Sequence, residues 1–338
     1  MLLDALGRAG IRFDMFDLAT SVDEARRAQK LGNIYHRGQD LAWNGREVLR
    51  ELLDRHGGIK VTPEQRTALV NIFGTIMWGE LAAWRISAQL ADALVPLEAK
   101  MAATSQAHDE ARHFYVMHDY LEALGEVPRT MDRPARRLLE LVLGTNSLAE
   151  KLIGMQLMVE TTALTIFQSV RDTGVEPVLG DLLRYFEKDE ARHVGLGVQT
   201  LPGLIRRMGR VEGLRLFVFQ LRVLGWSIAG LRTLAPHLRV LGIDPRTIMV
   251  LGRSKQVMAY NQLWDQLGRV ENVGVRDFVM RVLGGVEETM FPRGPEPQGL
   301  REQFAAFATG FSTAIDDNLV PVSLDPNEAP RPVKVRSN

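Results

Sequence analysis

The residues most able to do chemistry lie in a pentapeptide, Asp-Glu-Ala-Arg-His, that occurs at 109–113 and again at 189–193. Each copy places a glutamate three residues before a histidine, and residues three apart on a helix share a face. Each copy could therefore direct a carboxylate and an imidazole at one point. Both groups are metal ligands, so the repeat predicts a metal site.

A further glutamate lies thirty residues before each pair and extends the repeat. The two matched sets, 80 residues apart in the chain, are Glu80, Glu110 and His113, and Glu160, Glu190 and His193. The competing interpretation is a set of surface charge pairs on long helices. Surface pairing requires neither this register nor histidine, so we predict that these six residues are metal ligands.

The spacing also fixes where the chain must turn. Glu80 lies 15 residues before Val95, and Pro96 lies 14 residues before Glu110. Both arms are therefore roughly 21–22 Å long, at about 1.5 Å per residue. Two antiparallel helices turning at this point bring the two glutamates to the same height. A turn near 175–176 repeats the arrangement, so four ligand-bearing helices could meet at one level.

Apolar residues at three- and four-residue steps predict helices almost throughout, with breakers marking their ends. The four long helices are expected over 63 to about 94, 96 to about 125, 147 to 172–174, and 177 to about 210, with Asn146 or Ser147 as the third cap. The connection 126–146, with a short helix near 134–143, is long enough to cross a bundle. The second and third helices could then run parallel.

Composition narrows the classes of function. The 338 residues are 46% hydrophobic, and 41 Lys+Arg balance 41 Asp+Glu, so no basic field favours nucleic acid as a partner. The chain has no cysteine, which excludes disulfides, thiolate nucleophiles and cysteine-ligated zinc. A metal must therefore be held by Glu, Asp and His.

The N-terminus does not read as a signal peptide, and we expect a cytoplasmic protein. No stretch of about 18 residues is free of charge, so no membrane span is expected. The most apolar region, 214–234, is interrupted by Arg215, Arg222 and Arg232. We favour a buried or interface helix there over a helix lying on a membrane surface.

These motifs resemble those of the ferritin-like di-iron carboxylate proteins. The resemblance rests on the six ligand-type residues and on the two pentapeptides, and it covers about 65–210. It implies an all-α fold, a ferritin-like four-helix bundle with a long crossover and additional N- and C-terminal helices. We expect one domain over 1–320, with short flanking helices in 1–60, further helices in 211–320 and a Pro-rich extended tail over 321–338.

The chain's length and extra helices resemble the oxygen-activating branch, which includes ribonucleotide reductase small subunits, desaturases and N-oxygenases. That resemblance implies the six ligands named above. It also implies that Asp109 and Asp189 each hydrogen-bond the metal-bound histidine of the other motif, which agrees with the carboxylate partners that ligating imidazoles usually have. A surface charge is the alternative for each aspartate.

Departures from the family's patterns separate this chain from members of known substrate. Met117 stands where radical-storing reductase subunits carry tyrosine, and Phe186 where N-oxygenases add a histidine. Ala83 and Met155 occupy the positions of the Val–Tyr cross-link of ligand-binding oxidases, and Ala163 that of the desaturases' threonine. A tyrosyl radical and a Val–Tyr cross-link are therefore not expected.

For other polar and aromatic residues near the motifs, the sequence allows more than one role. Gln106 and Gln156, one turn before Glu110 and Glu160, either hydrogen-bond a ligand or satisfy buried polar groups. Arg112 and Arg192 either balance the site's acids or form surface ion pairs. For Trp84 and Phe186 we favour packing in the core over lining a pocket. For Tyr115 we favour packing over a redox role. His108 and His118 are expected on the outer face of their helix.

The leading hypothesis is an oxygen-activating dinuclear metal oxidase or oxygenase. It would hold two Fe ions, or Mn/Fe, and use O2 to hydroxylate, desaturate or N-oxygenate a small, mainly apolar organic substrate. An external electron donor and a homodimer are compatible with the sequence. The alternatives are a radical generator like the reductase small subunit and a non-catalytic metal-binding bundle.

Overall fold

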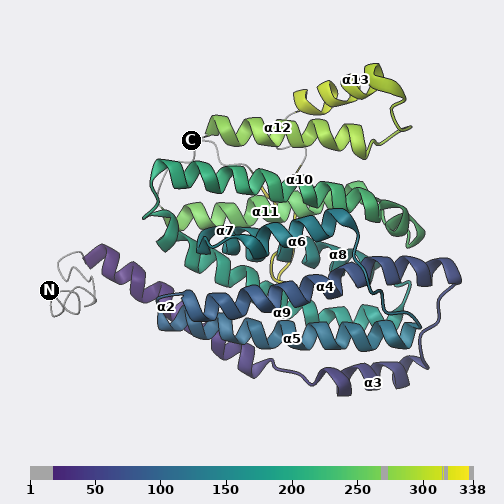
Figure 1. Cartoon of the computed structure of the whole chain (residues 1–338), viewed down its shortest axis with the longest axis horizontal. Coiled ribbons are helices and arrows are strands. Elements are labelled where there is room, and N and C mark those ends of the chain that lie inside the picture. The colour runs from purple at the N-terminus through teal and green to yellow at the C-terminus, as the bar shows by residue number, and fades with distance from the viewer. Residues whose placement is uncertain (1–17, 268–272, 314, 316–318, 335–338) are drawn as a thin grey trace.

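The fold was analysed in a computed structural model of the chain, which describes residues 18–267, 273–313, 315 and 319–334 (Figure 1). Helices dominate this part of the chain, and it contains no β-strand beyond a single isolated bridge between Val322 and Arg331. The all-α fold class expected from the sequence is confirmed.

Four long helical segments form the central bundle. They are α4 (Pro63–Ala93), α5 (Leu97–Leu124), the consecutive α7 (Leu148–Leu152), η1 (Ile153–Val159) and α8 (Glu160–Thr173), and α9 (Pro177–Ile205). Their starts follow from local capping, because Thr62, Ser147 and Glu176 each accept a hydrogen bond from the first turn that follows. Thr62 also forms a capping box with Gln65.

The direction of each helix follows from two separate groups of core residues. One group holds Leu90 of α4, Ala103 of α5, Leu152 of α7 and Leu201 of α9. It therefore joins the C-terminal halves of α4 and α9 to the N-terminal halves of α5 and the third segment. The other group joins the opposite halves. As the spacing predicted, α5 and the third segment run parallel, with the crossover helix α6 (Arg133–Gly144) between them in the chain.

Two details of the bundle differ from the expectation. The third segment is not a uniform α-helix, because η1 is a π-helix immediately before Glu160. A π-helical stretch carries no simple sequence signature, since it depends on packing against neighbouring helices. The fourth helix ends at Ile205 rather than near Arg210, where the next helix begins after Gly209.

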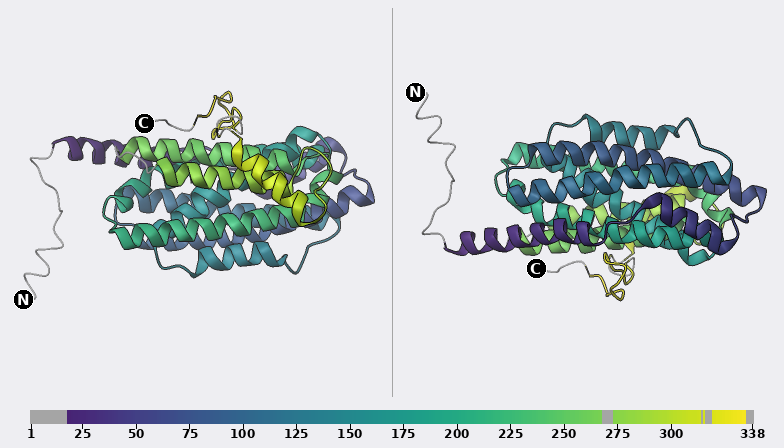
Figure 2. Two further views of the ribbon diagram at one scale, coloured as in Figure 1. Left: turned by 90° about the horizontal axis from the view of Figure 1, so that it is seen from above. Right: turned by 90° about the horizontal axis from the view of Figure 1, so that it is seen from below.

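Flanking helices lie along part of the bundle's surface (Figure 2). They are α2 (Leu18–Asp40), α3 (Gly45–His56), α10 (Arg210–Val240), α11 (Pro245–Leu267), α12 (Val273–Met290) and α13 (Gly299–Ser312). The expectation of several short helices in 1–60 was wrong for α2, which is 23 residues long and packs against α5 and α9. Residues 1–17 of that expectation lie outside the described residues.

The apolar helix α10 buries only one side, through residues such as Leu216, Phe219 and Val223. For 214–234 we expected a buried or an interface helix; full burial is excluded, whereas an interface on the exposed side stays a prediction. Of its most apolar 18-residue window, 17% is buried, and by length and composition α10 could cross a membrane. Length and composition alone do not distinguish a span from a surface helix, so the absence of a span stays a prediction.

Candidate metal centre

The six predicted ligands meet at mid-height of the bundle, between the two groups of core residues. Glu80 comes from α4, Glu110 and His113 from α5, Glu160 from α8, and Glu190 and His193 from α9. All six are buried, and the least so, Glu80, is only 4% exposed. The structure thus brings together side chains from four helices, as the thirty-residue spacings required.

The six residues form two overlapping groups, each able to hold one metal ion. The first group is Glu80, Glu110, His113 and Glu190, and the second is Glu110, Glu160, Glu190 and His193. In each group, one ligand atom from every residue lies within 4.8 Å of the others. Glu110 and Glu190 belong to both groups. The cluster can therefore hold two adjacent cations with two shared carboxylates.

The histidine rings are oriented by contacts on both of their nitrogens. His113 Nδ1 faces the cluster, 3.4 Å from Glu80 Oε2 and 3.3 Å from Glu190 Oε1. Its Nε2 lies 3.0 Å from Asp189 Oδ2. His193 Nδ1 lies 3.0 Å from Glu110 Oε1, and its Nε2 lies 3.4 Å from an oxygen of Asp109. Each aspartate therefore contacts the histidine of the other motif, in the geometry that the resemblance implied.

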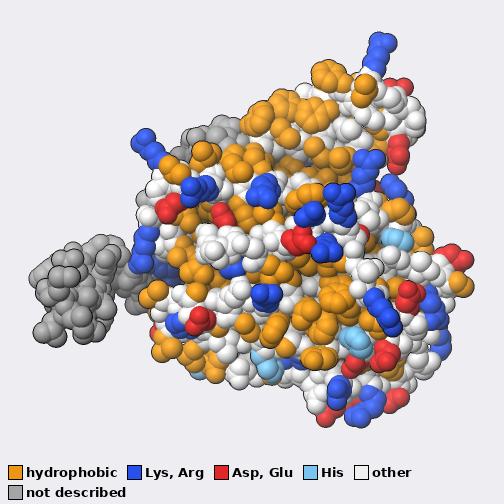
Figure 3. All heavy atoms as spheres, in the orientation of Figure 1, with side chains coloured by type: hydrophobic (Ala, Val, Ile, Leu, Met, Phe, Trp, Pro, Cys, Tyr) orange, Lys and Arg blue, Asp and Glu red, His pale blue; other side chains and the backbone are white. Residues whose placement is uncertain are grey.

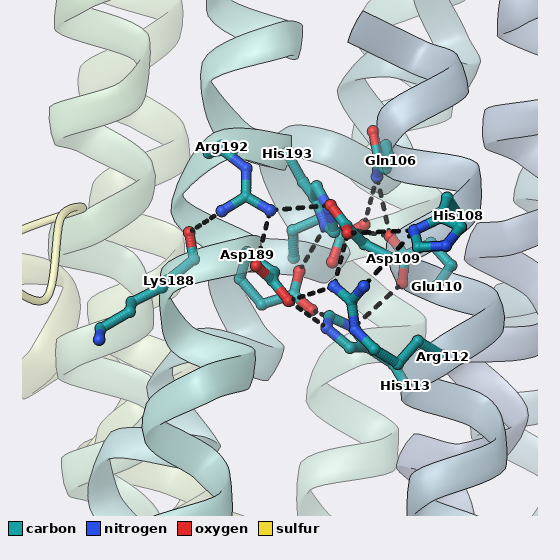
Figure 4. Close-up of polar contacts among 12 residues, drawn as sticks. Gln106, His108, Asp109, Glu110, Arg112, His113, Lys188, Asp189, Arg192 and His193 are labelled. Carbon is teal, nitrogen blue, oxygen red and sulfur yellow. Dashed lines mark hydrogen bonds and ion pairs between the residues drawn. The ribbon is translucent and has the colours of Figure 1, made fainter. Parts of the chain in front are cut away.

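Two buried arginines complete this network between the motifs (Figure 4). Arg112 donates to Asp109 over 2.6 Å and to Asp189 over 2.9 Å. Arg192 donates to the same two aspartates, over 2.8 and 2.6 Å. Since both guanidiniums are buried, they balance the acids of the site and are not surface ion pairs. The aspartates are consequently held by charged hydrogen bonds on both oxygens.

The two glutamines form a chain that reaches the ligands. Gln106 Nε2 donates to Glu110 Oε1 over 2.9 Å and to Glu160 Oε1 over 3.1 Å. Gln156 donates to Gln106 Oε1 over 3.4 Å. Of the two open alternatives, Gln106 therefore hydrogen-bonds two of the predicted ligands directly, whereas Gln156 contacts them only through Gln106.

Burial and the neighbouring charges shift the pKa values of the buried glutamates in opposite directions. Burial, followed by the negative charges of neighbouring glutamates, raises the pKa of Glu160 well above its usual value. Burial also raises the pKa of Glu80 well above its usual value, although the nearby His113 ring acts in the opposite direction. Burial opposes ionisation of Glu110 as well, but the charge of His193 and its hydrogen bonds hold that pKa below its usual range. The cluster thus combines acids that resist ionisation with acids that are readily charged.

The buried polar atoms fit a pair of cations. Within the described residues, Glu110 Oε2, His113 Nδ1 and Glu190 Oε1 have no hydrogen-bond partner. These atoms face the same interior space, where an unmatched polar group is costly. Metal coordination would satisfy them, and four carboxylates would offset the charge of two divalent ions. A set of four carboxylates and two imidazoles suits iron or manganese better than structural zinc.

An apolar cavity of about 180 Å³ adjoins the cluster. Glu80 and Glu160 form part of its wall, and the remaining lining comes mainly from aliphatic side chains of α4, α6, α8, α10 and α11. Ala83 and Ala163, two positions where this chain departs from family patterns, also line it. The cavity is slightly larger than one known to hold benzene, so it can accept a group of about that size.

The aromatic residues near the motifs differ from one another in their environment. Phe186 is fully buried and stacks on the ring of His113, with centroids 4.2 Å apart. Trp84 is 43% exposed and Tyr115 is 63% exposed, so the prediction that these two pack in the core was wrong. His108 is largely exposed, as expected for the outer face.

Sequence reasoning missed Trp43, which lies in the loop between α2 and α3. Its Nε1 donates to Asp189 Oδ2 over 2.9 Å, and the guanidinium of Arg112 lies 4.7 Å from the centre of its ring. No spacing rule connects Trp43 to the motif 146 residues away, so only tertiary packing reveals this contact.

The arrangement is that of a ferritin-like helical bundle, and solved structures share it. One is an R2-like ligand-binding oxidase with an aerobically reconstituted metal cofactor after photoconversion, with a TM-score of 0.57 and 16% identity over 71% of this chain and 94% of that chain. A variant with an aerobically reconstituted Fe/Fe cofactor has a TM-score of 0.57 and 17% identity over 71% and 94%.

A third structure, a variant of the R2-like ligand-binding oxidase with an anaerobically reconstituted Mn/Fe cofactor, has a TM-score of 0.56 and 18% identity over 69% of this chain and 92% of that chain. No family model and no curated protein matches the sequence. At these identities the likeness shows the fold. It confirms the ferritin-like bundle that the sequence implied.

Proposed function

We propose that the six-residue cluster holds two iron ions, or manganese and iron, and that the protein is an oxygen-dependent oxidoreductase. The observation that supports this most directly is the pair of overlapping ligand groups that share Glu110 and Glu190. The solved structures of the same fold carry Mn/Fe or Fe/Fe cofactors, which agrees with the donor set. Two adjacent redox-active ions, when bound, supply electrons to O2 and oxidise a strong bond.

The protein's own residues would orient and insulate this centre. Asp109 and Asp189 accept hydrogen bonds from the Nε2 atoms of the histidines, which leaves each Nδ1 free to bind an ion. Arg112 and Arg192 keep both aspartates charged and in place. Gln106 holds Glu110 and Glu160 in a fixed relation. Such rigid support keeps a ligand set ready for its ions.

The cavity supports an apolar substrate. Its wall includes Glu80 and Glu160, so a bound group would lie beside the ions. Apolar walls exclude water and would protect an oxidising centre from side reactions. A volume of about 180 Å³ fits the reacting part of a small organic molecule. We therefore place hydroxylation, desaturation or N-oxygenation of a mainly apolar compound within the proposal.

Oxygen uptake after anaerobic loading tests the proposal. Metal-free protein is loaded with Fe(II), the bound iron is counted, and O2 consumption is followed with an oxygen electrode. Close to two ions per chain and uptake proportional to bound iron are expected. Fewer than one ion per chain would contradict the metal centre, whereas bound iron without oxygen uptake would indicate a non-catalytic metal-binding bundle. A persistent protein radical would favour the radical-generator alternative.

A further inference from the structure

The outward side of α10 combines apolar and basic residues. Val211, Leu214, Val218 and Leu221 follow three- and four-residue steps and are 40–65% exposed, so they form one continuous stripe. Arg215 and Arg222 lie next to this stripe and are also exposed. We call these six residues the α10 outer face. Figure 3 shows basic side chains interspersed with apolar ones over this helix.

Positive charge is concentrated on helix α10. The sequence of α10 contains five arginines and one glutamate, while the whole chain has no net charge. Within the described residues, Arg215 and Arg222 have no ion-pair partner. The single glutamate, Glu212, accepts the backbone N–H of Gly209 at the start of the helix. The α10 outer face is therefore a local basic surface on a neutral protein.

The neighbouring helix α6 extends the basic surface. A groove between α6 and α10 is lined by Arg133 and Arg137 as well as by Arg215, Arg222 and the half-buried Trp226. Of the two acids at this groove, Glu140 pairs with Arg136 and Arg137, whereas Glu150 accepts from the Thr145 hydroxyl and keeps its charge. Arg133, Arg215 and Arg222 therefore leave the groove with a net positive charge. The groove thus offers guanidiniums above an apolar floor, which complements a molecule with an anionic head and an apolar body.

We propose that the α10 outer face and this groove bind the surface of an anionic lipid bilayer, with α10 lying in the plane of the interface. An exposed apolar stripe flanked by arginines, on a helix whose other side is buried, is the pattern of interfacial helices. A spanning orientation is disfavoured because the inner side of α10 packs on α4, α6 and α11. Phosphate groups of anionic lipids complement the unpaired arginines.

Helix α10 lies between the proposed lipid-binding surface and the cavity. Leu224, Ser227 and Leu231, on the inner side of the same helix, line the cavity beside Glu80 and Glu160. One helix therefore separates the proposed lipid-facing surface from the cavity. If the proposed function holds, an apolar substrate could reach the centre from the bilayer. Lipid binding itself does not depend on the metal centre.

Vesicle co-sedimentation of the full chain tests the proposal. Binding is expected to vesicles of phosphatidylcholine with one third phosphatidylglycerol, to be weak on phosphatidylcholine alone, and to fall as salt is raised. The variant Arg215→Gln/Arg222→Gln should bind about thirtyfold more weakly, since each arginine near an anionic bilayer contributes about 1 kcal/mol. Arg215→Lys/Arg222→Lys should retain most of the binding.

The matched control removes the same charge elsewhere. Arg46 and Arg50 are exposed on α3, which lies along the lower edge of the molecule in Figure 1, away from α10. Arg46→Gln/Arg50→Gln should bind like the unchanged protein. Equal loss in both double variants, or no binding to anionic vesicles, would overturn the proposal. So would a dimer in sedimentation velocity that dissociates in Arg215→Gln/Arg222→Gln, because a second copy would then cover the face.

A fluorescent label locates the contact. The chain has no cysteine, so a single introduced cysteine is labelled specifically. An environment-sensitive dye on Val218→Cys should shift to the blue when anionic vesicles are added, whereas the same dye on Glu51→Cys of α3 should not. Circular dichroism of each labelled variant confirms that the helices are intact. A blue shift only at position 51 would contradict the assignment of the surface.

Discussion

Glu110 and Glu190 differ from the other two glutamates because each lies within reach of both candidate ion positions. Glu80 and Glu160 each belong to one group only. Identical residue types in a repeated motif therefore have unequal roles. The two shared glutamates come from α5 and α9, which pack against each other, and their shared position leads to a direct test.

Glu110→Gln should lower the metal content from close to two ions per chain to near zero, because a shared carboxylate contributes to both positions. Glu80→Gln should leave about one ion per chain. Metal content after dialysis, measured by inductively coupled plasma mass spectrometry, checks this. Equal loss in the two variants would argue against a shared ligand.

The histidines make metal binding dependent on pH. Burial alone would lower the pKa of His113, but its hydrogen bond with Asp189 and the glutamate carboxylates close to its Nδ1 raise that pKa well above 6.5. Burial likewise opposes the charge of His193, and Glu110 and Glu190 raise its pKa well above 6.5. In the metal-free protein both rings therefore hold protons that an ion must displace.

Mn(II) affinity should accordingly rise with pH, by about tenfold per pH unit for each proton displaced. The sign follows because lowering the pH adds protons that compete for the same nitrogens. Free Mn(II) can be measured by electron paramagnetic resonance at pH 6, 7 and 8 at constant ionic strength. An affinity independent of pH would show that the rings are already neutral.

At the scale of elements, the close contact between α9 and η1 supports the glutamine chain. A Cβ placed on Gly197 would lie 2.9 Å from Gln156 Cβ and 3.2 Å from Leu157 Cδ2. Gly197→Ala should therefore destabilise the fold by about 1–3 kcal/mol through overpacking. Gly203→Ala, on the same helix but with no atom within 4 Å, should stabilise it by about 0.5 kcal/mol.

Chemical denaturation of the two glycine variants, with the unchanged chain as reference, measures both free energies. A destabilisation of similar size in both would mean that helix α9 tolerates neither methyl group, and would contradict the close approach at Gly197.

The cavity between helices offers a second test at this scale. Ala163 lies one turn after Glu160 and lines the cavity. Toluene should bind the unchanged protein in isothermal titration calorimetry, because about 180 Å³ accommodates a benzene-sized molecule. Ala163→Phe should abolish this binding by filling the space, while Ala163→Ser should retain it. Unchanged binding to Ala163→Phe would place the toluene elsewhere.

At the scale of the whole molecule, ion binding should be coupled to stability. The four buried glutamates lie close together, and ions that neutralise them bind the folded state only. Mn(II) at a hundred times its dissociation constant should add about 2.7 kcal/mol, which corresponds to about 4 °C in Tm for a chain of 338 residues. Calorimetry with and without a chelator measures this shift. The Glu110→Gln variant is the control, and an equal shift in it would attribute the effect to another site.

Much of the bundle could be predicted from the sequence because its signals are local. Thr62-Pro63, Ser147 and Pro177 begin helices through caps and prolines in the adjoining turn. The spacing of Glu80, Glu110 and His113 follows from the constant rise and rotation of a helix. These regularities hold whatever the rest of the chain does, so the sequence alone determined which carboxylates and imidazoles cluster, their common level and the class of fold.

Only the tertiary structure decided how the helices meet. The sharing of Glu110 and Glu190, the contact of Trp43 with Asp189, the π-helix before Glu160 and the exposed side of α10 all depend on residues far apart in the chain. The physical reason is that helical periodicity fixes which residues share a face, whereas packing between elements fixes what that face touches.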